Sequence, residues 1–170
     1  MRLPLIIHER IGHWARQLRP RVEAWPVKLI ETRPGDDVAT MARRSACPIL
    51  VVDLGDRPKL GLEAIDQAYS TAPLALILAL NSSKLPEVDT LARELGASRV
   101  LSGSINPPDV MTVLERWLPI AQKRAEADGW AEDRVPELEP WEELLESLNQ
   151  GSCACPEVRL VGATFVAPGS

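Results

Sequence analysis

Short apolar runs recur at intervals along residues 1–122 of this 170-residue chain. Two of them, Ile49–Val52 and Leu74–Leu80, contain only apolar side chains, which is typical of strands buried on both faces of a sheet. Each run is too short for an ordinary helix, and turn-forming residues separate it from the next segment. The pattern predicts five strands, at Leu3–Ile7, Val27–Glu31, Ile49–Val52, Leu74–Leu80 and Arg99–Ser102.

Each predicted strand is followed by a segment with the spacing of one apolar helix face. The first segment has Ile11 and Leu18 on that face and is expected to end at Pro20, because proline interrupts a helix. We expect Gly96 to end the fourth helix and Pro107 to begin the fifth. The inward positions of the later helices are Val38, Met41 and Ala42, then Leu62, Ile65 and Tyr69, then Val88, Leu91, Ala92 and Leu95, and last Val110, Val113, Leu114 and Trp117.

The alternation of five strands with five helices predicts an α/β fold. Strands that are connected through helices run parallel, and their right-handed crossovers place helices on both faces of the sheet. We therefore expect one α/β domain over residues 1–122.

Residues 123–170 differ from this domain in charge. Residues 1–122 carry 15 Lys and Arg against 14 Asp and Glu, or +1, whereas residues 123–170 carry 4 against 10, or −6. We interpret residues 123–170 as an acidic interaction tail. Its short stripe at helical spacing is expected to bind either a partner's groove or this chain's own domain. The stripe consists of Trp141, Leu144, Leu145 and Leu148.

Composition narrows the partners and the compartment. A near-neutral domain with an acidic tail disfavours nucleic acid as the main partner. No apolar run is long enough to cross a membrane. Three cysteines cannot all pair, and Cys47 stands at the start of a predicted buried strand, so we expect a reducing, cytoplasmic setting. Cys153 and Cys155 supply only two of the four ligands that a structural zinc ion needs, and we expect no cofactor.

Asp53 is the candidate site residue. Asp53 directly follows the apolar run Ile49–Val52. Gly55 lies in the loop after Asp53, and Gly61 lies near the end of that loop. In open α/β sheets, ligands bind at the carboxyl ends of the strands. The alternative is that Asp53 only caps the turn.

Residues 53–65, which read Asp-Leu-Gly-Asp-Arg-Pro-Lys-Leu-Gly-Leu-Glu-Ala-Ile, resemble the phosphoacceptor strand and loop of response-regulator receiver domains. The segment Leu95-Gly-Ala-Ser is similar to the stretch before that family's fifth strand, and Asn106-Pro-Pro-Asp-Val to the start of its last helix. The resemblance covers about residues 1–122. It implies a flavodoxin-like sheet with strand order 2-1-3-4-5.

The resemblance also implies an incomplete acidic pocket. The family holds magnesium with two acids after the first strand, the acceptor aspartate and a loop carbonyl. Here His8 and Glu9 stand at the two acid positions, so only Glu9 retains a carboxylate. Asp53 stands at the acceptor position, and Gly55 offers the carbonyl. Magnesium prefers oxygen ligands, so only weak binding at Glu9 and Asp53 is expected.

The two groups that grip the phosphoryl oxygens in the family are missing from the aligned positions. Leu78, or Ala79 with a shift of one residue, stands where the family has a hydroxyl, and Gly103 stands where it has lysine. Asn81, Ser82 or Ser83 could replace the hydroxyl only through a shifted loop. Without that lysine no cation offsets the phosphoryl charge on Asp53. This pattern predicts a pseudo-receiver that keeps the fold but has lost the phosphorylation switch.

We therefore expect a non-enzymatic adaptor that binds protein partners, as a monomer or a homodimer. The first alternative is a genuine receiver that is phosphorylated on Asp53 with magnesium. The second is a flavodoxin-like protein that binds a nucleotide or another small molecule. A zinc-protease site at His8, Glu9 and His13 is disfavoured, because the histidines are five residues apart instead of four.

Overall fold

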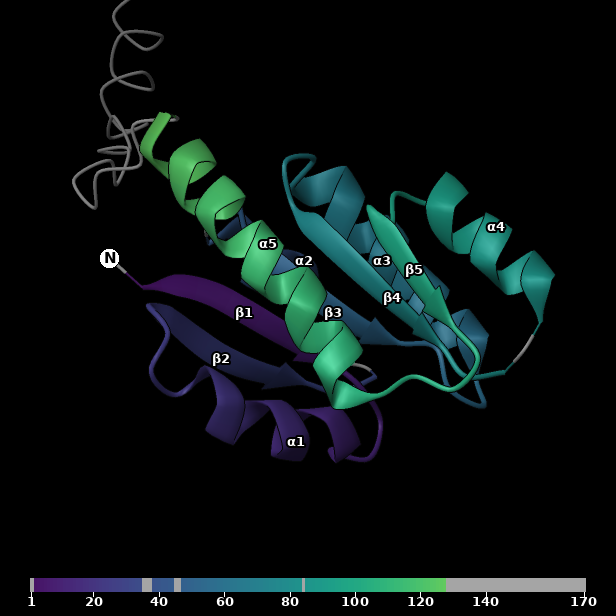
Figure 1. The fold of residues 1–170 in the computed structure, drawn as a ribbon. Coiled ribbons are helices and arrows are strands. Elements are labelled where there is room, and N and C mark those ends of the chain that lie inside the picture. Colours follow the sequence, from purple (N-terminus) through teal and green to yellow (C-terminus); the bar gives the residue numbers. More distant parts are fainter. Residues whose placement is uncertain (1, 35–37, 45–46, 84, 128–170) are drawn as a thin grey trace, which may run out of the picture. The chain divides into compact units, whose positions relative to one another are not determined.

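A computed structural model of the chain describes residues 2–34, 38–44, 47–83 and 85–127. Strands and helices alternate through this part of the chain (Figure 1). The strands are β1 (Leu3–His8), β2 (Val27–Thr32), β3 (Ile49–Asp53), β4 (Leu76–Asn81) and β5 (Arg99–Ser102). The helices are α1 (His13–Val22), α2 (Val38–Arg43), α3 (Pro58–Thr71), α4 (Pro86–Glu94) and α5 (Pro107–Ala127).

The five strands form one parallel sheet in the order β2-β1-β3-β4-β5. Helices α1 and α5 cover one face, and α2, α3 and α4 cover the other (Figure 1). The predicted flavodoxin-like fold and its strand order are confirmed. The fold follows from the sequence pattern, because runs that are apolar at every position fit only a sheet covered on both faces.

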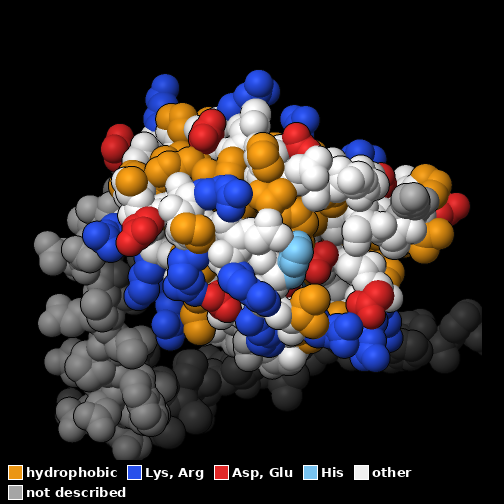
Figure 2. Space-filling view, turned by 60° about the horizontal axis from the view of Figure 1, so that its bottom comes forward, with side chains coloured by type: hydrophobic (Ala, Val, Ile, Leu, Met, Phe, Trp, Pro, Cys, Tyr) orange, Lys and Arg blue, Asp and Glu red, His pale blue; other side chains and the backbone are white. Residues whose placement is uncertain are grey.

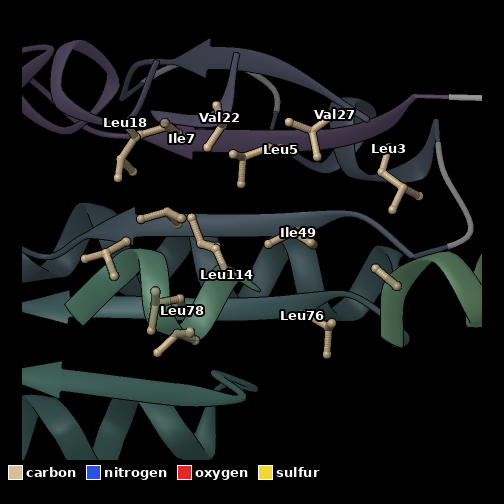
Figure 3. Close-up of a cluster of buried hydrophobic side chains, with 14 of the residues drawn as sticks. Leu3, Leu5, Ile7, Leu18, Val22, Val27, Ile49, Leu76, Leu78 and Leu114 are labelled. Atoms are coloured by element: carbon tan, nitrogen blue, oxygen red, sulfur yellow. The ribbon is translucent and has the colours of Figure 1, made fainter. Parts of the chain in front are cut away.

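Successive residues of the central strands point to opposite faces of the sheet. Leu5, Ile7 and Ile49 point from their strands toward Leu18 of α1 and Leu114 of α5 (Figure 3). The opposite core is rich in alanine from α3 and α4, and small side chains let these helices lie close to the sheet. The two faces are therefore packed with side chains of different size.

Two features at the helix ends match the predictions. Gly96 follows α4 with a φ of 110°, a backbone conformation that glycine adopts without strain. A side chain at Gly96 would also collide with Tyr69, because its Cβ would lie 2.3 Å from Tyr69 Cγ. Helix α5 begins at Pro107 and continues to Ala127, so residues 123–127 of the predicted tail belong to this helix.

The start and end of α1 were predicted wrongly. The helix begins at His13, after Ile11, and Ile11 is 67 % exposed instead of facing the core. It also continues past Pro20 to Val22. Proline at this position removes only one hydrogen bond near the helix end, and the burial of Val22 in the core stabilises the last turn.

Three further apolar side chains lie at the surface instead of in the core. Tyr69 and Leu91 are 46 % and 45 % exposed. Tyr69 packs over Gly96, while α4 contacts the core mainly through Val88 and Ala92, which leaves Leu91 outside. Leu74 is also exposed, because β4 begins two residues later than predicted.

Within the described residues, no helix is long and apolar enough to cross a membrane. Trp141, Leu144, Leu145 and Leu148 lie outside these residues, so the division into a domain and an acidic tail stays a prediction.

Candidate functional site

Asp53 lies at the carboxyl end of β3, in the middle of the sheet. Its Oδ1 accepts a hydrogen bond from the Gly55 N–H at 3.1 Å, which closes a tight turn. Gly55 has a φ of 39° in this turn. Gly61 lets α3 lie close to this turn, because it has no side chain. A Cβ at Gly61 would lie 3.1 Å from the Asp53 carbonyl oxygen and 2.6 Å from Leu54 Cδ2.

The surroundings of Asp53 disfavour the charged form of its carboxyl group. Burial raises the pKa of Asp53 above the ordinary value, and the negative charges of Glu9 and Asp56 raise it further. The hydrogen bond from Gly55 and the proximity of His13 act in the opposite direction on this pKa. The balance shows that the site gives Asp53 too little positive charge to offset its desolvation.

Glu9 has a structural role that its sequence position does not reveal. Its side chain is buried, and its two carboxylate oxygens accept hydrogen bonds from the backbone N–H groups of Trp14 at 2.8 Å and Ala15 at 2.7 Å. These N–H groups belong to the first turn of α1, where no carbonyl of the helix can accept them. Glu9 therefore caps α1, and its negative charge is stabilised at the positive end of the helix.

His8 is directed to a different neighbour. It is 4 % exposed, and its Nδ1 lies 3.0 Å from Thr32 Oγ1 of β2. The two residues that the sequence aligns with an acid pair therefore have separate roles, one between β1 and β2 and the other at the start of α1.

The pairing of β3 with β4 identifies the β4 residue that lies beside Asp53. Leu78 lies opposite Val51, and Leu80 lies opposite Asp53. Leu78 thus lies two residues before the β4 residue that pairs with Asp53, and Ala79 faces the opposite core. The fully buried Leu80 is the β4 residue beside Asp53, and it has no hydroxyl to offer.

Gly103 follows β5 directly, as the alignment predicts. Its N–H donates to the Asn81 carbonyl oxygen at 2.9 Å, and its φ is 85°. A Cβ at Gly103 would have no heavy atom within 4 Å. The space beside this position is open, and no side chain of the described residues occupies it.

A pocket of about 460 Å³ opens beside Asp53. Arg10 and Asp56 form an ion pair at its wall, with 3.1 Å between Arg10 Nη2 and Asp56 Oδ2. Sequence reasoning missed this pair, although both residues adjoin candidate site residues. The other lining residues are Ile11, His13, Trp14, Asp53, Gly55, Ser82 and Ile105.

A second missed feature fixes the loop after β4. The Asn81 side-chain amide donates to Asp89 Oδ1 at 2.6 Å and to the Leu85 carbonyl oxygen at 3.0 Å. Asp89 Oδ2 accepts a hydrogen bond from the Ser102 hydroxyl, which ties the same network to β5. Asn81 is 1 % exposed, so water does not compete strongly for these bonds.

The residues around Asp53 do not form a good magnesium site. Magnesium requires several oxygen ligands in near-octahedral geometry. Both oxygens of the buried Glu9 accept hydrogen bonds from α1, which lowers the capacity of Glu9 to bind a metal ion beside Asp53. Among the described residues there is also no cluster of three or more His, Cys, Asp or Glu side chains suited to hold a metal ion.

No protein-family model matches the sequence, and no curated protein matches it. Solved structures do match the fold. A CheY-like response regulator receiver domain protein from Methanospirillum hungatei has a TM-score of 0.60 and 16 % identity, over 72 % of this chain and 98 % of the other.

Two further structures give similar values. A response regulator from Burkholderia pseudomallei, with a phosphorylated aspartic acid, calcium and citrate, has a TM-score of 0.57 and 20 % identity over 86 % of this chain and 84 % of the other. The receiver domain of a sensor histidine kinase from Pseudomonas aeruginosa, with magnesium in its active site cleft, has a TM-score of 0.57 and 13 % identity. This match covers 70 % of this chain and 99 % of the other. The chain therefore has the fold of response-regulator receiver domains.

Proposed function

We propose that the chain is a non-catalytic pseudo-receiver, a cytoplasmic module that binds protein partners without a phosphorylation switch. The observation that carries this proposal is the environment of Asp53. The position beside it on β4 is the apolar Leu80, and the position after β5 is Gly103. Neither supplies the hydroxyl or the cation that a phosphoryl group on Asp53 would need.

The charges around Asp53 support the same proposal. Phosphorylation would replace the single negative charge of the Asp53 carboxylate by about −1.5 to −2 charges, at a site that already contains Glu9 and Asp56. Arg10, a cation of the pocket wall, is engaged with Asp56. The added negative charge would therefore meet weak compensation.

The hydrogen bonds of Asn81 provide independent support. A switch at Asp53 has to move the neighbouring loops between two arrangements. The loop after β4 is held by the bonds of Asn81 to Leu85 and Asp89, and Asp89 is also bonded to Ser102. This network favours one arrangement of the loop.

A phosphotransfer assay tests the proposal. The protein is incubated with magnesium and acetyl phosphate, and its intact mass is measured under mildly acidic conditions that preserve an acyl phosphate. We expect no substantial gain of one phosphoryl group. A gain that disappears in Asp53→Asn would overturn the proposal and establish a genuine phosphorylated receiver.

A restoration variant makes a negative result informative. Leu80→Thr combined with Gly103→Lys introduces a hydroxyl and a cation at the two positions that lack these groups. If these positions explain the loss, the double variant should gain phosphoryl label that is absent from the original chain. Thr90→Ser with Arg99→Lys is a matched control that changes exposed residues elsewhere. Equal labelling of both double variants would contradict our interpretation.

The acidic tail is proposed to contribute to partner binding through the stripe that includes Trp141 and Leu145. If the stripe binds a partner, Trp141→Ala with Leu145→Ala should keep the melting temperature and lose a copurifying protein. A large fall in melting temperature with unchanged copurification would assign the stripe a structural role instead.

A further inference from the structure

The open edge of the sheet at β2 is a surface that the Asp53 site does not explain. In the described part of the chain, β2 pairs with β1 on one side and with no other strand. It is six residues long and contains no proline, whereas β5 at the opposite edge has four residues. Long, unprotected edge strands are templates for the addition of another strand.

The hydrogen bonds of β1 identify which groups of β2 are free to pair. The Leu3 N–H donates to the Pro26 carbonyl oxygen, and the Glu9 N–H donates to the Thr32 carbonyl oxygen. Backbone groups alternate in direction along a strand, so even-numbered residues of β2 face β1. The N–H and C=O groups of Val27, Leu29 and Glu31 therefore point to the open edge.

A groove of about 480 Å³ lies beside the first half of β2, between this strand and the end of α1. Pro20, Val22, Val27 and Leu29 give it apolar walls. Val22 and Val27 are buried and Leu29 is half-buried, so the groove has a firm apolar floor next to the free backbone groups.

The charge of the groove is positive. Arg2, Arg19 and Lys28 line it against one acid, Glu23. Arg2 and Lys28 are exposed and form no ion pair within the described residues. Figure 2 shows the side of the molecule that carries α1, where Lys and Arg side chains are spread over much of the surface.

The cations beside the other half of β2 already have an acidic partner. Glu31 pairs with Arg19 and also with Arg33, whose Nη2 lies 3.0 Å from Glu31 Oε2. The unpaired cations are thus confined to the end of the edge where the groove lies. A ligand that satisfies them needs acidic side chains next to residues 27–29.

We propose that the β2 edge and its groove bind an extended acidic segment of a protein partner, which adds a strand to the sheet. Its backbone pairs with Val27, Leu29 and Glu31, alternate apolar side chains lie on the groove floor, and acidic side chains contact Arg2 and Lys28. A second copy of this chain is a poorer occupant, because pairing two β2 strands gathers the cations of both copies at one interface. The inference rests on the proposed role in protein binding and names the chemistry of the partner.

The test uses the full chain and a capped synthetic peptide of alternating Glu and Val, with a Lys and Val peptide as the control. Affinity is measured by calorimetry, and the binding site is located by amide hydrogen exchange. We expect the Glu peptide to bind and to slow exchange at Leu29 and Glu31, while the inward amides of Lys28 and Ile30 stay unchanged. Equal binding of the Lys peptide, or protection elsewhere, would overturn the proposal.

Two variants sharpen the test. Lys28→Glu should weaken binding of the Glu peptide by about tenfold or more, because the substitution replaces an attraction by a repulsion. Arg99→Glu makes the same change in charge on β5, the opposite edge strand, and should leave affinity unchanged. Leu29→Pro removes the outward N–H together with the Leu29 side chain of the groove wall, and it should also abolish binding. If the Leu29→Pro variant unfolds, comparing the peptide affinities of Lys28→Glu and Arg99→Glu still tests the proposal.

Other occupants give different results. Protection of Leu29 and Glu31 in the free protein, with sedimentation as a dimer, would assign the edge to a second copy and reject our proposal. Protection in a free monomer would show that the edge is already covered, with the same consequence. Phosphotransfer to Asp53 is measured separately, so failure of the peptide to bind does not decide whether the chain is a pseudo-receiver.

Discussion

Two carboxylates follow neighbouring strands of this sheet, and their environments differ. Glu9 after β1 is buried and accepts two backbone hydrogen bonds from α1. Asp53 at the end of β3 is half-buried, accepts one hydrogen bond from the Gly55 N–H, and lines an open pocket. Glu9 therefore stabilises the fold, whereas Asp53 lies at the wall of a pocket that is open to solvent.

This difference shows that acids at the same edge of a sheet do not by that fact form one binding site. A carboxylate whose two oxygens both accept hydrogen bonds from a helix end has less capacity to bind a metal ion, even when sequence alignment places it among ligands. Asp53 lines an open pocket, whereas Glu9 caps α1 and stabilises the fold. Four variants test this contrast.

Glu9→Ala should have the largest effect. The change leaves two buried N–H groups of α1 without an acceptor and removes a charge from the helix end, and it should lower the free energy of unfolding by about 3 kcal/mol. Urea denaturation measures this change. Glu87→Gln, at an exposed position in the first turn of α4, is the matched control and should cost less than about 0.5 kcal/mol. Similar values for the two variants would show that Glu9 is not a structural cap.

Gly61→Ala should have the next largest effect, because it forces α3 away from the Asp53 turn. The added Cβ would lie 2.6 Å from Leu54 Cδ2 and 3.1 Å from a backbone oxygen. We expect a loss of about 2 kcal/mol in unfolding free energy. Gly103→Ala is the comparison, since it has open space and only its positive φ to oppose it. A smaller loss for Gly61→Ala than for Gly103→Ala would contradict this packing argument.

Asp53→Asn should change the pH dependence of stability. The raised pKa of Asp53 means that the native protein keeps this proton to higher pH than the unfolded chain, so its favourable contribution is present below the ordinary aspartate pKa and is lost as the pH rises through the raised value. The variant lacks this loss and should be more stable at neutral pH by about 0.5 kcal/mol, after allowance for solvent screening. Thermal unfolding of both proteins between pH 4 and pH 7 measures the difference, with Asp66→Asn on the exposed side of α3 as control. A variant that is less stable than the original at neutral pH would refute the expected sign.

Arg10→Ala should have the smallest effect. Its ion pair with Asp56 is exposed, with side-chain accessibilities of 49 % and 70 %, so water and salt weaken it. A double-mutant cycle with Asp56→Ala should give a coupling energy of about 0.5 kcal/mol or less, decreasing with added salt. A salt-independent coupling above about 1 kcal/mol would show that this pair holds the pocket wall in place.

The sequence by itself determined the order of the elements and the class of the fold. Uniformly apolar Ile49–Val52 required a strand covered on both faces, and the helical spacing after each strand required crossovers between parallel strands. Gly96 and Pro107 marked helix boundaries because their backbone constraints are local. These features depend on residues within a few positions of one another, and local patterns predict them well.

Only the tertiary structure decided the details of the site. The pairing of β3 with β4 placed Leu80 instead of Leu78 beside Asp53, and the approach of α1 turned Glu9 from a candidate ligand into a cap. The open side of β2 likewise follows from its position at the end of the sheet. Strand register and helix contacts are fixed by packing between segments that lie far apart in the sequence, so no local pattern contains them.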